Sequence, residues 1–288
     1  MIDYSKFIEN SRKWLSQYIK DNHLQSIIIG VSGGIDSTVS CAIASPVCKE
    51  LNIPLIGRSL PTTSNKIGET TTAFKVGEAF CNDFKEVPIE NSFNFVFSDL
   101  ALNEGRITPL QEGNIKARLR MIYLRHLASI HKGVVLDNDN FTEWNLGFWT
   151  VGGDSPMDIN LGLHYLWKTE IYELAKYLVT NYAAQNKLKE SNVIIESIKL
   201  IPTDGNGISN SDCDQFGLDN YEQVDDVLKT MYYPKLDENG MANSNEFIRL
   251  IDSYNEQGVD KVMMLHQNTN YKRKELPIKP TKEELGLC

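Results

Sequence analysis

Apolar residues follow two spacings along the chain, and each spacing predicts a different kind of element. In the segment 1–25, Tyr4, Phe7, Leu15 and Ile19 recur at helical spacing, which predicts an amphipathic N-terminal helix. The run 26–31 (SIIIGV) is short, apolar and rich in β-branched side chains. Such a run is typical of a strand buried on both faces, so we expect it at the centre of a parallel sheet.

Further runs of both kinds alternate along the chain. The later predicted strands are 53–60, 84–89 and 133–136, and the predicted helices are 36–51, 68–81, 114–131 and 168–182. Strands that alternate with helices form βαβ units, so we expect an α/β fold with a Rossmann-like parallel sheet and helices on both faces. No repeat or low-complexity linker interrupts 1–288, which we interpret as one domain. The polar tail 268–288 either docks on that domain or is partly disordered.

Composition and charge narrow the function classes. The chain has 288 residues, is 41% hydrophobic and carries a net charge of -9. This charge argues against nucleic acid as a partner, because phosphate backbones need clustered Lys and Arg. Its five cysteines are scattered without CxxC spacing, as expected of reduced thiols in a cytoplasmic protein. We find neither a signal-peptide pattern nor an apolar run of ~18 residues, so we expect no membrane partner.

The segment Ser32–Ser37 (SGGIDS) joins the predicted central strand to a helix. Two glycines let a ligand approach the backbone, and the helix N-terminus offers N–H groups and partial positive charge to an anion. Asp36 would repel a bare phosphate, so a bridging metal ion is its natural explanation. The alternative is a plain Gly-Gly turn with Asp36 or Ser37 as the helix N-cap. The candidate phosphate-binding residues are Ser32, Gly33, Gly34, Ser37 and Thr38.

The order SGGxDS resembles the pyrophosphatase loop (PP-loop) of the ATP pyrophosphatases, and it lacks the Gly-Lys-Ser/Thr of a Walker A loop. The resemblance implies the adenine nucleotide alpha hydrolase-like fold of that class. It also implies cleavage of ATP between the α and β phosphates, with adenylation of a substrate. The motif identifies the class of enzyme and leaves the substrate open.

Further segments, in matching order, resemble the ammonia-dependent NAD synthetase family. The segment 113–121 (GNIKARLRM) resembles its GNxxARxRM, and 143–158 (EWNLGFWTVGGDSPMD) resembles its E-x3-G-[YF]-[FW]-T-x2-GD-x3-D. Three shorter family patterns resemble 166–169 (LWKT), 202–203 (PT) and 272–273 (KR). Without the resemblance, 143–158 would be interpreted as a Gly-Asp turn with an aromatic core stripe, and the basic residues as solvated surface.

The resemblance implies a reaction and a role for each matching residue. The chain would be a ligase that amidates deamido-NAD with free ammonia through an acyl-adenylate, releasing AMP and pyrophosphate from ATP, and it would be a homodimer. Mg²⁺ would be held by Asp36 and Glu143, since it prefers carboxylate and phosphate oxygens. The implied catalytic residues are Asp36, Glu143, Asp154 and Lys168. The implied further ATP contacts are Arg58, Asn138, Lys168 and Thr203. The implied deamido-NAD contacts are Asn114, Arg118, Phe148, Trp149, Asp154, Asp158, Lys272 and Arg273.

Several positions depart from the family pattern and mark this chain as a divergent member. Asp137 and Asn138 stand where the family has Gly-Thr. Arg58 lies one place early, which favours the other face of its strand. Residues 204–206 (DGN) replace the family's Ala-Asp-Leu in the segment 203–215, which would close over the site. The alternative is therefore a divergent PP-loop protein that adenylates another substrate or binds nucleotide without turnover.

Overall fold

The computed structural model describes residues 2–235, 244–274 and 279–287. At its centre lies a five-stranded sheet in the order β3-β2-β1-β4-β5, in which every neighbouring pair is parallel. Its strands are β1 (Ser26–Gly30), β2 (Leu55–Ser59), β3 (Asp83–Glu86), β4 (Gly133–Asp137) and β5 (Ile159–Asn160). β1 pairs with β2 on one side and with β4 on the other, so the predicted central position of this strand is confirmed.

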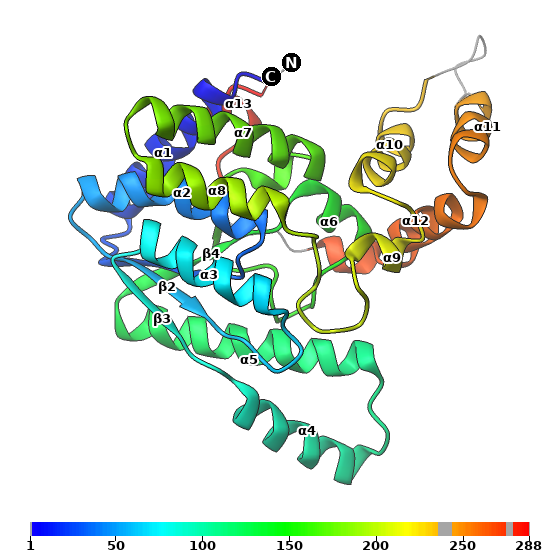
Figure 1. Ribbon diagram of the computed structural model, residues 1–288, viewed down its shortest axis with the longest axis horizontal. Coiled ribbons are helices and arrows are strands. Elements are labelled where there is room, and N and C mark those ends of the chain that lie inside the picture. Colours follow the sequence, from blue (N-terminus) through cyan, green and yellow to red (C-terminus); the bar gives the residue numbers. More distant parts are fainter. Residues whose placement is uncertain (1, 236–243, 275–278, 288) are drawn as a thin grey trace.

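Helices cover both faces of the sheet, as predicted (Figure 1). One face carries α1 (Tyr4–Asp21), α2 (Ile35–Glu50), α3 (Ile67–Phe80), α7 (Lys168–Ala184) and α8 (Leu188–Lys199). The other face carries α5 (Pro109–Ile130), against which α4 (Glu90–Glu104) packs as it projects from the body of the molecule (Figure 1). The β1–α2–β2 and β2–α3–β3 units place β2 and then β3 on one side of β1 in the sheet. The chain then crosses back, and β4 pairs with β1 on its other side.

Shorter helices form a second group beyond the carboxyl ends of the strands. These are α6 (Phe141–Leu146), η1 (Leu163–Tyr165), α9 (Asp212–Phe216), α10 (Tyr221–Tyr232), α11 (Ser244–Ser253), α12 (Glu256–Asn268) and η2 (Asn270–Lys274). The last helix, α13 (Lys282–Leu285), lies apart from this group. α9, α10, α11 and α12 share a core centred on Phe216, Val224 and Val259. Of the polar tail, α13 docks on α1 and buries Leu285, whereas residues 275–278 and 288 lie outside the described part.

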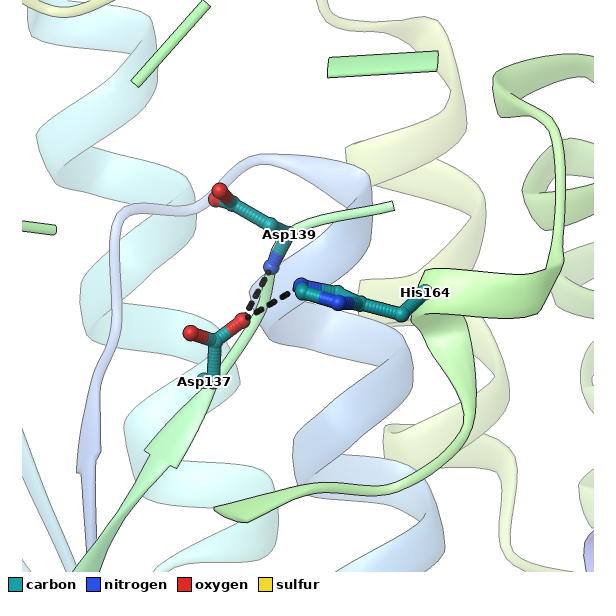
Figure 2. A group of neighbouring side chains, drawn as sticks. All are labelled: Asp137, Asp139 and His164. Carbon is teal, nitrogen blue, oxygen red and sulfur yellow. Dashed lines mark hydrogen bonds and ion pairs between the residues drawn. The ribbon is translucent and has the colours of Figure 1, made fainter. Parts of the chain in front are cut away.

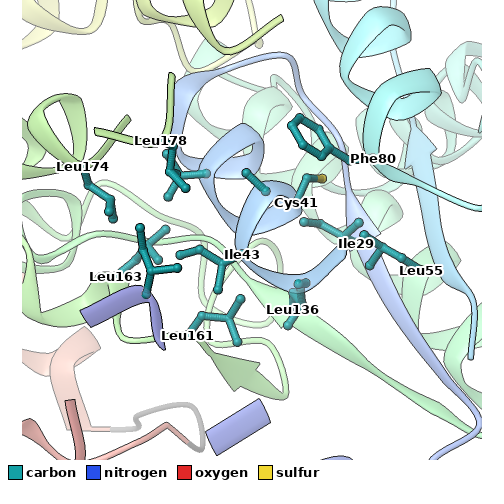
Figure 3. Close-up of a cluster of buried hydrophobic side chains, with 14 of the residues drawn as sticks. Ile29, Cys41, Ile43, Leu55, Phe80, Leu136, Leu161, Leu163, Leu174 and Leu178 are labelled. Carbon is teal, nitrogen blue, oxygen red and sulfur yellow. The ribbon is translucent and has the colours of Figure 1, made fainter. Parts of the chain in front are cut away.

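The apolar run of β1 explains its central place. Ile27 and Ile29 belong to the core on the α2 side, and Ile28 packs with Leu124 of α5 on the opposite face. Figure 3 shows the α2 side, where Ile29 and residues of the neighbouring strands face α2. Each fully buried isoleucine contributes about 1.5–3 kcal/mol of hydrophobic free energy. A strand with apolar residues on both faces is therefore stable only between two layers of helices.

Element boundaries differ from the predictions in instructive ways. The helix predicted from 114 begins at Pro109, because Thr108 and Gln111 form a capping box in front of a proline at the first helical position. The strand predicted for 84–89 ends at Glu86. The helices α4, α6 and α8–α13, the 3-10 helices η1 and η2, and the short strand β5 were not predicted. Among the described helices, none combines the length and apolar character needed to cross a bilayer.

Candidate active site

A cavity of about 630 Å³ lies at the carboxyl ends of β1, β2 and β4. It lies where the chain reverses from one side of β1 to the other, the place where parallel α/β sheets bind ligands. The predicted residues that line it are Ser32, Gly34, Asp36, Ser37, Arg58, Asn114, Arg118, Asn138, Glu143, Phe148, Trp149, Asp154, Lys168, Thr203 and Lys272. Segments far apart in sequence thus meet at one place.

The SGGIDS loop presents the N-terminus of α2 to this cavity. Gly33 has a φ of +85°, and a Cβ there would collide with the backbone of Glu69 and Ala73 in α3, so glycine is required. The N-cap is Gly34, with no side-chain hydrogen bond, so the alternative of Asp36 or Ser37 as N-cap is wrong. The first N–H groups of α2 therefore remain available to an anion in the cavity.

Lys168 joins the two carboxylates that were predicted to hold a cation. Its buried Nζ donates to Asp36 Oδ2 at 2.6 Å and to Glu143 Oε1 at 2.8 Å. Burial opposes the charge on Lys168, but the two carboxylates outweigh it and raise its pKa well above the ordinary value. Burial in turn raises the pKa of Glu143 to about 7, and the charge of Asp36 adds to that effect. One positive charge thus sits between two negative ones.

The same geometry fits Mg²⁺. Asp36 Oδ2 and Glu143 Oε1 both lie within 2.8 Å of one cationic nitrogen, so the two oxygens converge on a single point. Carboxylate oxygens that converge in this way, with room for phosphate oxygens beside them, are the ligands that Mg²⁺ prefers. Lys168 and a divalent cation would compete for these oxygens, because both need the same negative charge.

Three further acidic residues, Asp139, Asp154 and Asp212, line this part of the cavity. Burial raises the pKa of Asp212 to about 6 and the pKa of Asp154 above its ordinary value. Burial, followed by the charges of Asp137 and Asp154, raises the pKa of Asp139 well above its ordinary value. Burial is the largest cause of each shift, and neighbouring carboxylates add to it for Asp139 and Asp212. A cation bound beside these groups would favour their ionised forms.

Asp137 and His164 belong to a buried network beneath the cavity. Asp137 accepts hydrogen bonds from Ser155 Oγ, Met157 N, Asn160 Nδ2 and Asp139 N, and its Oδ1 lies 3.3 Å from His164 Nε2. Figure 2 shows the carboxylate of Asp139 pointing away from the other two side chains. A shared metal ion would need free lone pairs on Asp137 and a convergent Asp139. We therefore interpret the group as a hydrogen-bond network.

The aromatic segment 147–154 forms another wall of the cavity. Lys272 Nζ donates to the carbonyl oxygens of Gly147 and Trp149 at 2.6 and 2.5 Å. From α5, Arg118 donates to Val151 O at 3.3 Å. Trp149 stacks on Trp144 with their ring centroids 4.8 Å apart. The segment is therefore held from two sides, which fixes a flat aromatic surface beside the carboxylates.

Some predicted residues do not reach the cavity lining. Thr38 is buried and bonds Gly34 O and Ser197 Oγ. Asp158 accepts from Val135 N at 2.8 Å and pairs with Arg125. The remaining two are Gly33, which packs on α3, and Arg273, whose guanidinium donates to the carbonyls of Asn145 and His266. In each case the side chain or backbone is used to hold neighbouring elements together.

Arg58 lines the cavity, but its guanidinium contacts Asp83 in the neighbouring edge strand β3. Nη1 and Nη2 donate to the two carboxylate oxygens of Asp83 at 3.1 and 3.0 Å. This bidentate pair holds β3 beside β2 and lowers the pKa of Asp83. The arginine that lies one place early in β2 thus forms an ion pair with Asp83 of β3.

Two residues near the site were not singled out from the sequence. Asp139 lines the cavity, and Asn140 Nδ2 donates to Asp36 Oδ1 at 2.8 Å. Both follow β4 directly, and polar residues just after a parallel strand are the signal that could have found them.

Comparisons with known proteins agree with this geometry. The family model described as NAD synthase matches residues 7–276. The ammonia-dependent NAD(+) synthetase of Thermoplasma volcanium is 29% identical over 275 residues, which cover 95% of this chain and 97% of that protein. The enzyme of the same name from Thermoplasma acidophilum is 31% identical over 81% of this chain and 86% of its own length.

Solved structures share the PP-loop fold. The NMN synthetase of Francisella tularensis superposes with a TM-score of 0.72 at 23% identity, over 98% of this chain and 100% of that one. The ammonia-dependent NAD synthetase of Campylobacter jejuni superposes with a TM-score of 0.67 at 21% identity, over 96% and 99% of the two chains. With the family model matching most of its length, the chain belongs to the NAD synthase family.

Proposed function

We propose that the chain amidates the nicotinate carboxylate of deamido-NAD with ammonia. The carboxylate attacks the α phosphorus of ATP, pyrophosphate leaves, and ammonia then displaces AMP from the acyl-adenylate to give NAD. The observation that carries this proposal is the convergence of the SGGIDS loop with Asp36, Glu143 and Lys168 in one cavity. An anion-binding helix end next to a cation-binding carboxylate pair is what a nucleotide triphosphate with its counter-ion requires.

The residues of the chain act mainly by binding and orientation. Ser32, Gly34 and Ser37, with the first N–H groups of α2, would hold the β and γ phosphates. Lys168 would exchange its contact with Asp36 and Glu143 for a contact with a phosphate oxygen. Its ammonium group would then neutralise part of the negative charge on the leaving pyrophosphate. Thr203 and the segment around it would cover the nucleotide and keep water from the acyl-adenylate.

Asp36 and Glu143 would hold Mg²⁺, which when bound neutralises charge on the pyrophosphate leaving group. The aromatic segment with Phe148 and Trp149 supports the nicotinate end of the substrate, because a flat ring stacks favourably on aromatic side chains. Asp154 lies beside that wall, where its carboxylate would attract ammonium and hold ammonia near the acyl carbon. Asn114, Arg118 and Lys272 would keep the wall in place or contact the substrate.

The test is an assay of AMP and NAD with ATP, Mg²⁺, ammonium and deamido-NAD. We expect Asp36→Asn and Glu143→Gln each to lower turnover about 10³-fold, because each removes a ligand of the charge-neutralising cation. Glu173→Gln changes an exposed residue paired with Lys176 and is the matched control. ATP binding without AMP release by the unchanged protein would instead support nucleotide binding without turnover.

The assay should also offer nicotinic acid mononucleotide as the acceptor. One solved structure that shares the fold is an NMN synthetase, and the amidation chemistry is the same for the mononucleotide and the dinucleotide. A ratio of kcat/KM values that favours deamido-NAD by about tenfold or more supports the proposed substrate. A ratio that favours the mononucleotide would reassign the substrate and leave the catalytic residues unchanged.

We further propose that the chain is a homodimer in the cytoplasm. Helices α4 and α5 expose Phe95, Leu102 and Ile122, large apolar side chains of the kind expected at an interface. The described cysteines, Cys41, Cys48, Cys81 and Cys213, are free thiols. Free thiols suit a reducing compartment.

A further inference from the structure

We infer that Asn140 is a positioning residue that holds Asp36 and Glu143 in the arrangement that binds the cation. This inference rests on the proposed function, since it assigns a role toward the proposed cation ligands. It concerns a side chain that neither the family pattern quoted above nor the cavity lining singles out. Asn140 is fully buried and lies between the two acidic residues in space.

The contacts of Asn140 complement those of Lys168. Lys168 Nζ takes Asp36 Oδ2 and Glu143 Oε1. Asn140 contacts the other oxygen of each carboxylate. Its Nδ2 donates to Asp36 Oδ1 at 2.8 Å, and its backbone N lies 3.5 Å from Glu143 Oε2. If a cation replaced Lys168 at Asp36 Oδ2 and Glu143 Oε1, Asn140 would still contact the other oxygen of each carboxylate. These contacts would keep the two carboxylates in the same orientation.

The amide of Asn140 is suited to this task because it carries an oxygen that accepts and an NH₂ group that donates. Its Oδ1 accepts the backbone N–H of Glu143 at 3.0 Å, as the N-cap of α6. This cap fixes the amide orientation, so that Nδ2 must face Asp36. An aspartate would present a second negative charge to Asp36, and a serine would keep the cap but be too short to reach it.

The connection matters because the two carboxylates come from separate elements. Asp36 lies in the first turn of α2, whereas Glu143 lies in α6, the short helix that follows β4. Two like charges at close range repel each other while Lys168 is exchanged for the cation. Asn140 is rigid through its cap and linked to Asp36 across 104 positions of sequence, so it holds the pair against that repulsion.

The test separates the cap from the contact with Asp36. Asn140→Ser keeps an N-cap side chain and loses the donor to Asp36. Asn220→Ser is the matched control, because Asn220 caps α10 with the same 3.0 Å bond to a backbone N–H three residues on. Binding of Mn²⁺ to the full chain with a non-hydrolysable ATP analogue is measured by electron paramagnetic resonance, alongside the melting temperature and the folded fraction.

We expect Asn140→Ser to weaken Mn²⁺ binding about tenfold or more, the typical effect of losing a hydrogen bond to a charged group. Its melting temperature should change no more than that of Asn220→Ser. If it reduces the folded fraction, Asn140→Thr offers a second cap residue, and the Mg²⁺ concentration for half-maximal activity is measured on the folded molecules. A purely structural role would lower the folded fraction and leave that concentration unchanged.

The outcomes distinguish this inference from the proposed function. Mn²⁺ affinity equal to that of the unchanged chain in both Asn140 variants, together with loss of binding in Glu143→Gln, would overturn the role of Asn140 alone. Binding that survives Glu143→Gln would overturn the cation site itself, and the role of Asn140 with it. Weak binding in the Asn140 variants with normal binding in Asn220→Ser supports the inference.

Discussion

At the scale of single residues, the site is governed by burial of charge. Glu143, Asp212 and Asp154 all have raised pKa values because burial disfavours their ionised forms. Lys168 stays charged because Asp36 and Glu143 outweigh its own burial. Several shifted pKa values in one cavity are characteristic of functional sites, since a protein keeps costly buried charges where a ligand will use them.

The pKa of Glu143 leads to a prediction about pH. With a pKa of about 7, Glu143 is largely protonated in mildly acidic solution and must lose its proton to bind a cation. Calorimetric affinity for Mn²⁺ should therefore rise about tenfold from pH 6 to pH 8 and level off above that pH. Glu143→Gln is expected to abolish this dependence. Equal affinity at about pH 6 and pH 8 in the unchanged chain would contradict the prediction.

Asp137 gives a second prediction at the residue scale. Burial opposes its ionisation, but His164, Met157 N and Asn160 outweigh burial and lower its pKa. Asp137→Ala leaves these donors buried without their acceptor, so we expect the free energy of unfolding in urea to fall by about 3–5 kcal/mol. Because the folded pKa lies below the unfolded one, this stabilisation is present above the ordinary carboxylate pKa and is lost as the solution is acidified.

The control for Asp137 is Glu173→Gln, which changes an exposed pair with Lys176 and should alter the free energy of unfolding by less than about 0.5 kcal/mol. A loss below about 1 kcal/mol for Asp137→Ala would mean that the network stabilises little. By the family resemblance, Asp137 stands at a glycine position. Asn160 and His164 contact its carboxylate and offset the cost of burying it there.

At the scale of elements, the irregular segment 201–211 is fastened to neighbouring elements. Asn206 Oδ1 accepts from Arg120 Nη1 at 3.2 Å, and Gly205 O accepts from Ser64 Oγ at 3.3 Å. Thr203 Oγ1 bonds Glu69 of α3. The residues 204–206, which depart from the family pattern, are thus the ones that hold this segment against α5 and the loop after β2.

These contacts predict that Asn206→Ala loosens the segment. It removes an acceptor from the half-buried guanidinium of Arg120, a loss of about 1.5–3 kcal/mol in local stability. We expect faster amide hydrogen exchange in 201–211 and a KM for ATP raised about tenfold, with kcat reduced less. Asn210→Ala is the control, since Lys66 contacts only the backbone carbonyl of Asn210 and that contact remains. Unchanged exchange in Asn206→Ala would show that the segment is held by other contacts.

At the scale of the whole molecule, one surface departs from the usual polar exterior. On α4, Phe95 is 77% exposed and Leu102 is 83% exposed, and on α5 Ile122 is 58% exposed. α4 projects from the body of the molecule (Figure 1), and these side chains are exposed to solvent. Clustered exposed apolar residues on two packed helices are expected to be covered by a second copy of the chain.

The dimer prediction is tested by substituting both apolar residues. Light scattering should give twice the chain mass of 32.6 kDa, about 65 kDa, for the unchanged protein. Phe95→Glu with Leu102→Glu should shift the mass to that of one chain, because the charges would be buried at the interface. Leu188→Glu, on an exposed residue at the start of α8, should leave the mass unchanged. A single-chain mass for the unchanged protein would refute the dimer.

By itself, the sequence determined the α/β class, the central strand and the loop–helix junction that carries SGGIDS. These follow from local rules: an apolar β-branched run must be buried on both faces, and a glycine pair before a helix exposes its N–H groups. The family resemblance added the order of the segments that meet in the cavity. The division into one domain and the roles of individual residues toward substrate stay predictions.

Only the tertiary structure decided which side chains face one another. Lys168 lies between Asp36 and Glu143, Arg58 turns to Asp83, and Asn140 faces Asp36. None of these pairings is local in sequence, so no spacing rule encodes them. The pKa values of the acidic residues depend on the same long-range packing, because burial and neighbouring charge exist only once separate elements have come together.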